Sequence, residues 1–253
     1  MQARVVPALR GVRWLGEGWR MFRAAPLGWL SLVFIYLLGT QVLARVPLVG
    51  VVAALLAVPG LTAGMMGAAR AASRGGAPRI AMLFDAFRSG PREQLALGAI
   101  YLGCSMLIFG AMSLADPDGA LRAALAGRGA PEEPEAADLA AAAAAFAILY
   151  APVMMMFWFA PVLAAWHSAG AAKSLFFSFF ACLVNWRAFL AYGAVTALVM
   201  VALPLAALSL PLVLLGAERS MMAPLVLPLL VFMLPTLFAS FYASYRDVFG
   251  GGE

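Results

Sequence analysis

The first candidates for chemistry in this sequence are its single histidine and the serine that follows it, His167 and Ser168. A serine nucleophile needs a histidine base, an acid that orients the base, and donors that stabilise an oxyanion. No Asp or Glu lies close to this pair in the sequence. We therefore expect no catalytic pair here and interpret His167 as a histidine at the end of an apolar run.

Metal and cofactor sites are not indicated by residue spacing either. One histidine and two isolated cysteines, Cys104 and Cys182, form no recognisable ligand cluster. The glycines of RGGAPR, residues 74–79, have neither the length nor the strand-to-helix setting of a phosphate-binding loop. We expect no catalytic residue, no cofactor and no metal. A membrane-embedded enzyme would require four side chains to gather around one pocket: Asp85, Glu93, His167 and Asp247.

The composition indicates an integral membrane protein. Hydrophobic residues make up 64% of the 253 positions and charged residues only 11%. So few charges cannot cover the surface of a soluble protein of this size, whereas lipid-facing helices need none. The apolar runs are continuous rather than alternating, which favours helices over a barrel.

Six runs are long enough to cross about 30 Å of hydrocarbon as helices. Their residue ranges are 27–44, 46–69, 94–115, 139–166, 188–217 and 220–245. Two residues or fewer separate the first run from the second and the fifth from the sixth, so these pairs predict tight helical hairpins. The predicted fold is all-α, a polytopic membrane protein with six transmembrane helices arranged as three hairpins.

The cations predict the orientation of these spans. Thirteen of the 17 Lys and Arg residues lie in the two tails and the two longer loops that share their side, and four lie in the opposite loops. Because cationic loops stay in the cytoplasm, both termini are predicted to be cytoplasmic. This topology accounts for the net charge of +5, and nucleic acid is not expected as a partner.

Shorter apolar segments precede the predicted hairpins. A helical wheel of residues 10–23 gathers Val12, Leu15, Trp19 and Phe22 on one side and charged residues on the other, which predicts an amphipathic helix in the membrane interface. Residues 80–88 and 173–186 are predicted to form similar interfacial helices. We therefore divide the chain into a cytoplasmic interfacial helix, residues 1–26, and a six-span membrane domain, residues 27–253.

We interpret this succession of interfacial segments and hairpins as a threefold internal repeat. Each unit is one interfacial helix followed by one hairpin, and the second span of each hairpin carries a proline 11 or 12 residues before a cation: Pro59, Pro161 and Pro235. The alternative is that membrane boundaries everywhere favour arginine, aromatic residues and proline.

Two sets of side chains are candidate functional residues. Exposed cations near the interface attract anionic lipid headgroups, and the candidates for these contacts are Arg13, Arg20, Arg23, Arg88 and Arg92. Hydroxyls within spans can line a transport cavity, and the candidates are Thr196, Ser209, Thr236 and Ser240. The interiors of the six runs carry no Asp, Glu, Lys or Arg, which argues against proton-coupled transport.

Three stretches resemble an uncharacterised family of proteobacterial six-span inner-membrane proteins. They are residues 158–193, with W-x-A-P and S-F-x-A-C-x-x-N-W patterns, residues 83–88, LFDAFR, and residues 242–249, with a Y-x-S-Y-R-D-x-F pattern. The resemblance implies a location in the bacterial inner membrane and no particular activity.

The function that we expect is a non-enzymatic, lipid-interacting or membrane-organising scaffold, or a partner-binding subunit. Its partners would be anionic lipids at the cytoplasmic face and a second membrane protein. The alternative is a small transporter or channel that uses the proline-kinked spans. Oligomeric state is not indicated by these residues.

Overall fold

The computed structural model describes residues 3–115, 136–202, 204–206, 209 and 219–250, and within them every regular element is a helix. The helices are α1 (Ala8–Ala24), α2 (Pro26–Ala44), α3 (Val49–Ser73), the 3₁₀ helix η1 (Ile80–Phe84), α4 (Asp85–Ser89), α5 (Pro91–Ala115), α7 (Ala136–Phe157), α8 (Ala160–His167), α9 (Ala171–Val184), α10 (Trp186–Ala197), the π-helical η2 (Leu198–Ala202) and α12 (Arg219–Phe249).

Five helical segments of the described chain are long and apolar enough to cross a membrane: Pro26–Ala44, Val49–Ser73, Pro91–Ser113, Ala140–His167 and Trp186–Ala206. They correspond to the first five predicted spans. The sixth, residues 220–245, falls within the 31-residue α12, but the side chains of 219–227 and 230 lie outside the described part. Six spans and the hairpin arrangement therefore remain predictions.

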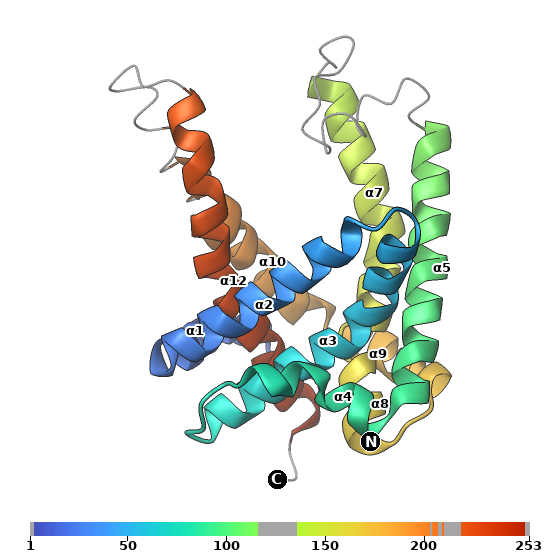
Figure 1. The fold of residues 1–253 in the computed structure, drawn as a ribbon, viewed down its shortest axis with the longest axis vertical. Coiled ribbons are helices and arrows are strands. Elements are labelled where there is room, and N and C mark those ends of the chain that lie inside the picture. The colour runs from blue at the N-terminus through green and yellow to red at the C-terminus, as the bar shows by residue number, and fades with distance from the viewer. Residues whose placement is uncertain (1–2, 116–135, 203, 207–208, 210–218, 251–253) are drawn as a thin grey trace.

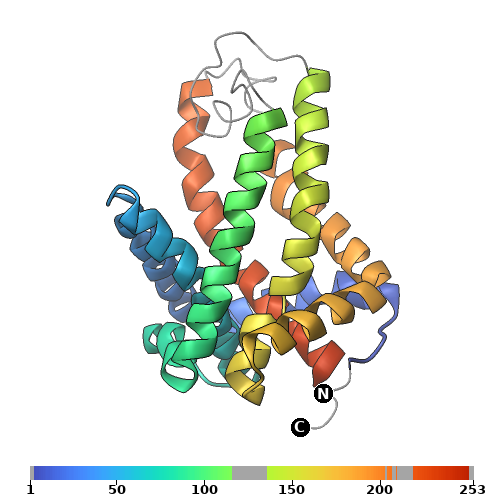
Figure 2. The ribbon, with the colours of Figure 1, turned by 90° about the vertical axis from the view of Figure 1, so that its right-hand side faces the viewer.

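The helices diverge from one end of the molecule. Figure 1 shows both termini at this end, together with α1, α4, α8 and α9, and Figure 2 shows the same arrangement from the side. From there α5, α7 and α12 run toward the opposite end. Helix α2 packs beside α3, and α5 packs beside both α3 and α7. We call the end that holds the termini the base and the opposite end the far end.

The predicted span 139–166 is not one continuous helix. Helix α7 ends at Phe157 and α8 begins at Ala160, with Pro161 in its first turn. Proline has no N–H to donate, and its ring clashes with the carbonyl four residues earlier, here that of Phe157. The same residue type is tolerated inside α3 and α12, where Pro59 and Pro235 are both buried.

The predicted span 188–217 also differs. Helix α10 ends at Ala197 and continues as a π turn through Ala202, directly before Pro204. A wider turn is one way in which a helix adapts to a proline that cannot close the regular hydrogen bond. The remainder of this predicted span lies largely outside the described residues.

Helix α1 is packed against the membrane-length helices rather than lying apart from them. It contacts α10 through Gly11 and α12 through Gly18, and a Cβ atom built on Gly11 would lie 1.9 Å from the backbone oxygen of Ala188. Glycine is required at such a close approach of two backbones. Of the four residues on its predicted apolar side, Leu15 and Phe22 are buried, whereas Val12 and Trp19 are 42% and 40% exposed.

The predicted segment 80–88 forms η1 and α4 and packs on a strip of glycines in α3. Leu83 lies against Gly64, and the ring of Phe87 lies against Gly60. Small residues let a neighbouring backbone approach closely without a hydrophobic driving force in lipid. This short segment therefore closes the base between α3 and α5.

Candidate functional site

Helix α9 presents an apolar face to its surroundings. Phe176 and Phe180 are 59% and 44% exposed and lie one helical turn apart. The exposed cation Lys173 lies in the first turn of α9, and the exposed Arg187 lies just beyond its end, in the first turn of α10. An aromatic stripe bounded by cations is typical of a helix in the headgroup region of a bilayer.

The opposite face of α9 is polar and buried. Ser178 accepts a hydrogen bond from the backbone N–H of Phe159 at 2.9 Å and donates one to the carbonyl oxygen of Met155 at 2.7 Å. Both groups belong to the break between α7 and α8, so Ser178 replaces backbone hydrogen bonds that the break removes. Burial raises the pKa of the neighbouring thiol of Cys182, which keeps it neutral in this core.

Two further polar side chains fix the base. The amide Nε2 of the fully buried Gln94 donates to the carbonyl oxygen of Pro161 at 2.9 Å. Asn185, at the end of α9, donates from Nδ2 to the carbonyl oxygen of Arg4 and accepts from the N–H of Val6. These contacts orient α9 with its hydrogen-bonding groups inward and its rings outward.

Charged groups of α1 and α12 form a cluster on the inner side of α1. Arg10 donates two hydrogen bonds to Asp247, at 2.7 and 2.5 Å, and the indole Nε1 of Trp14 donates to the same carboxylate at 2.7 Å. Glu17 accepts a hydrogen bond from Arg246 and lies 3.5 Å from Arg10. The hydrogen bond to Asp247 raises the pKa of Arg10. These contacts join α1 to α12.

The other arginines of α1 face outward. Arg13, Arg20 and Arg23 are all exposed, and Arg20 makes only a long ionic contact with Glu17, at 3.9 Å. Trp19 lies among them on the outer surface. Cations interleaved with a half-exposed indole suit the boundary between lipid and water.

The remaining two candidate lipid contacts lie on a different part of the base. Arg88 is in α4 and lies 3.2 Å from Asp85, and Arg92 is in the first turn of α5. Both are exposed. The five predicted lipid contacts thus belong to two groups, three on α1 and two around the junction of α4 and α5.

Three of the four hydroxyls predicted to line a cavity belong to the contact between α10 and α12. The hydroxyls of Tyr192 and Ser240 share a hydrogen bond of 2.6 Å. Thr196 and Thr236 lie one helical turn from these two residues, on α10 and α12 respectively. The hydroxyl of Thr236 is buried and has no hydrogen-bond partner among the described groups. Ser209 is exposed and donates to its own segment, to the carbonyl oxygen of Ala206.

Three of the four ionisable residues that an enzyme would require have different partners. Asp247 binds Arg10, the Nε2 of His167 lies 2.7 Å from the hydroxyl of Tyr245, and Asp85 lies beside Arg88. Among the described residues, no three His, Cys, Asp or Glu side chains are grouped so that they could hold a metal ion.

Several residues of this site were not predicted from the sequence. Ser178 and Asn185 lie within the predicted segment 173–186, and Gln94 lies at the beginning of the predicted span 94–115; the sequence analysis gave none of them a role of its own. The sequence held one signal for Ser178, its closeness in sequence to Pro161. A proline in the middle of a span leaves backbone groups without hydrogen bonds, and serines in a nearby apolar segment can supply the missing partners.

Comparison with known proteins gives one full-length similarity. The chain is 38% identical to a probable inner membrane protein of Burkholderia thailandensis over 263 aligned positions, which cover 100% of this chain and 96% of the relative. No family model matches the chain. No solved structure matches it.

Proposed function

Because the chain belongs to the family of the Burkholderia thailandensis inner membrane protein and is a multi-pass inner-membrane protein, we propose that it is a non-enzymatic scaffold whose base binds lipid headgroups. In this proposal the base lies at the cytoplasmic face, six spans form three hairpins, and α1, α4 and α9 lie at the level of the headgroups. The exposed arginines of the base support this orientation, because cationic segments stay in the cytoplasm.

One observation carries the proposal: α9 turns Ser174 and Ser178 into the protein and two of its four phenylalanines, Phe176 and Phe180, out. A helix in water would do the reverse, because burying polar groups and exposing rings both cost free energy. The arrangement is favourable where the outer face meets lipid. Lys173 and Arg187 then lie near headgroup phosphates, and the outward arginines of α1 extend the same cationic surface.

The test measures the anionic lipid that the protein retains. Four outward arginines are changed to glutamine together: Arg13, Arg20, Arg23 and Arg92. Each cation near an anionic surface contributes about 1 kcal/mol. The variant, reconstituted in discs with equal amounts of phosphatidylglycerol and phosphatidylcholine, should retain at least about tenfold less phosphatidylglycerol by native mass spectrometry.

The matched control changes the same four arginines to lysine. Lysine keeps the charge but loses the planar guanidinium fork, so this variant should retain nearly the wild-type amount of phosphatidylglycerol. Equal retention by the glutamine variant and the wild type would contradict the proposal, as would equal losses in the glutamine and lysine variants.

A small transporter is the second candidate, and the unpartnered hydroxyl of Thr236 is the observation that favours it. The change Thr236→Val keeps the shape and removes the hydroxyl. If no ligand uses this oxygen, the variant should be more stable by about 1 kcal/mol, since an unsatisfied buried polar group is removed. Stabilisation of the wild type by sodium chloride over potassium chloride in thermal unfolding, lost in the variant, would favour transport.

A further inference from the structure

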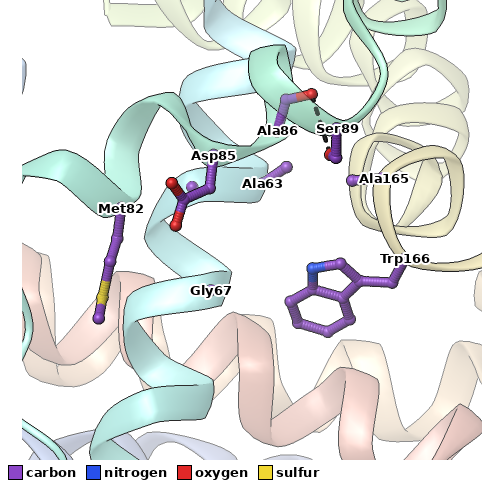
Figure 3. A pocket seen from close by; sticks show the side chains of 9 residues that line it. Ala63, Gly67, Met82, Asp85, Ala86, Ser89, Ala165 and Trp166 are labelled. Atoms are coloured by element: carbon purple, nitrogen blue, oxygen red, sulfur yellow. Dashed lines mark hydrogen bonds between the residues drawn. The ribbon is translucent and has the colours of Figure 1, made fainter.

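A pocket of about 240 Å³ lies at the base where α3, η1–α4 and α8 meet (Figure 3). Its wall on the α3 side is made of Ala63, Gly64 and Gly67, which have almost no side chain. The space exists because these small residues face the larger side chains of the neighbouring elements.

The other walls bring three functional groups to this space. Figure 3 shows Asp85 and Met82 on one side of Gly67 and Trp166 on the other; the indole of Trp166 is directed toward Gly67, and the largely exposed carboxylate of Asp85 is directed toward the side of Met82. A carboxylate, a thioether and an aromatic ring together suit a small organic cation. A single carboxylate is too few ligands for a divalent metal ion.

Positive charge lies next to the pocket as well. The guanidinium of Arg88 is 3.2 Å from Asp85 and largely exposed, so its pairing with that carboxylate is weak in water. The guanidinium of Arg70 stacks over the ring of Trp166, 4.9 Å from its centroid, and holds the ring at the pocket. A ligand that carries both a cation and an anion is complementary to this arrangement.

We propose that this pocket binds the headgroup of an ethanolamine phospholipid, with its primary ammonium donating to Asp85 and its phosphate next to Arg88. The proposal rests on the proposed function, because it requires the base to lie among lipid headgroups. To the proposed function it adds selectivity for ethanolamine phospholipids, which the outward arginines do not supply. A quaternary ammonium has no N–H to donate and is larger, so choline headgroups bind less well.

The experiment compares two zwitterionic lipids of equal net charge, so anionic-lipid binding does not affect it. Full-length protein is reconstituted in discs that contain equal amounts of phosphatidylethanolamine and phosphatidylcholine, and native mass spectrometry measures the retained lipids. The wild type should retain phosphatidylethanolamine over phosphatidylcholine by about tenfold, the discrimination expected of a charge-assisted hydrogen bond.

Three variants locate the site. Asp85→Asn should lower the preference to near one, because the carboxylate is lost. Gly67→Leu should do the same by filling the pocket; a Cβ atom on Gly67 meets nothing within 4 Å, so the change is compatible with the fold. Glu93→Gln is the matched control: it removes a carboxylate in the first turn of α5 that does not line the pocket, and it should keep the preference for the ammonium.

Soluble glycerophosphoethanolamine in excess should displace the retained phosphatidylethanolamine from the wild type, whereas glycerophosphocholine should not. Ethanolamine alone, which lacks the phosphate, should displace less. If free ethanolamine displaces as well as the phosphodiester does, the ligand is a small amine and the lipid assignment is overturned.

A wild type without preference, or a preference that survives in both Asp85→Asn and Gly67→Leu, would overturn the proposal. Neither result depends on the four outward arginines. Their glutamine variant should retain less phosphatidylglycerol and should keep the preference for phosphatidylethanolamine. The two proposals therefore fail separately.

Discussion

At the base, hydrogen bonds from side chains hold backbone segments and helices together. Ser178 joins the two halves of a broken helix, Gln94 bonds to the start of the second half, and Asp247 accepts hydrogen bonds from side chains of α1. Toward the far end, the described contact between α5 and α7 is of another kind, a hydroxyl–hydroxyl distance of 3.1 Å between Tyr101 and Tyr150, with ring packing around it. Many apolar side chains there are exposed, among them Leu107 at 76%.

The difference indicates what each region depends on. Specific hydrogen bonds and close backbone contacts position the base, and removing one partner leaves a buried group unsatisfied. The far halves of the helices depend on lipid as their solvent, where apolar side chains cost nothing and loose packing is tolerated. Substitutions should therefore be costly at the base and mild toward the far end, and the following predictions test this contrast.

The largest effect is expected where α1 touches α12. The change Gly18→Leu should lower the free energy of unfolding by about 3 kcal/mol, because its Cβ atom would lie 2.3 Å from the carbonyl oxygen of Thr236 and the two helices must separate. Equilibrium unfolding in mixed micelles measures the change. Gly16→Leu on the same helix is the control, since a Cβ atom there meets nothing within 4 Å. Equal losses in both variants would show that α1 is not docked through Gly18.

A smaller effect is expected at the charged cluster. Asp247→Asn removes the carboxylate that accepts hydrogen bonds from Arg10 and Trp14, and it should cost about 2 kcal/mol, since Arg10 remains as a partly buried cation. Asp85→Asn, at an exposed ion pair, should change stability by less than about 0.5 kcal/mol. The same micelle titration compares them, and similar values would remove the distinction between buried and exposed pairs.

The smallest effect is expected at the helix break. Ser178→Ala leaves the N–H of Phe159 and the carbonyl of Met155 without their partner and should cost about 1 kcal/mol. Ser105→Ala removes a hydroxyl that bonds only to its own helix, at the carbonyl oxygen of Tyr101, so its effect should be near zero. Amide hydrogen exchange at residues 155–161 should increase only in the first variant, and unchanged exchange there would refute this role of Ser178.

The sequence predicted the class of fold because hydropathy is a local property. The boundaries of α2 and α5 differ from the predicted spans by a few residues at most, since Arg45 and Pro91 mark their ends in the sequence itself. The all-helical fold and the inner-membrane location are confirmed. The sixth span, the hairpins and the threefold repeat stay predictions.

The details of the base were not predictable in the same way. Both Pro161 and Pro235 lie within predicted spans, yet a helix ends before the first and continues through the second. The difference depends on neighbours distant in sequence, since Ser178 and Gln94 supply hydrogen bonds around Pro161. The wheel of α1 did not indicate its docking for a related reason: it ranks side chains by hydrophobicity, whereas Gly11 and Gly18 are buried because they have no side chain.

The docking of α1 has a consequence for biogenesis. Its partners are α10 and α12, and Arg10 and Asp247 are 237 positions apart. The chain is synthesised from its N-terminus, so the binding site of α1 stays incomplete until α12 has been inserted. Until then its tryptophan and phenylalanine faces must be shielded by the bilayer surface or by the insertion machinery. A chain without α12 would lack the contacts of Asp247 and Arg246 that hold α1 in place.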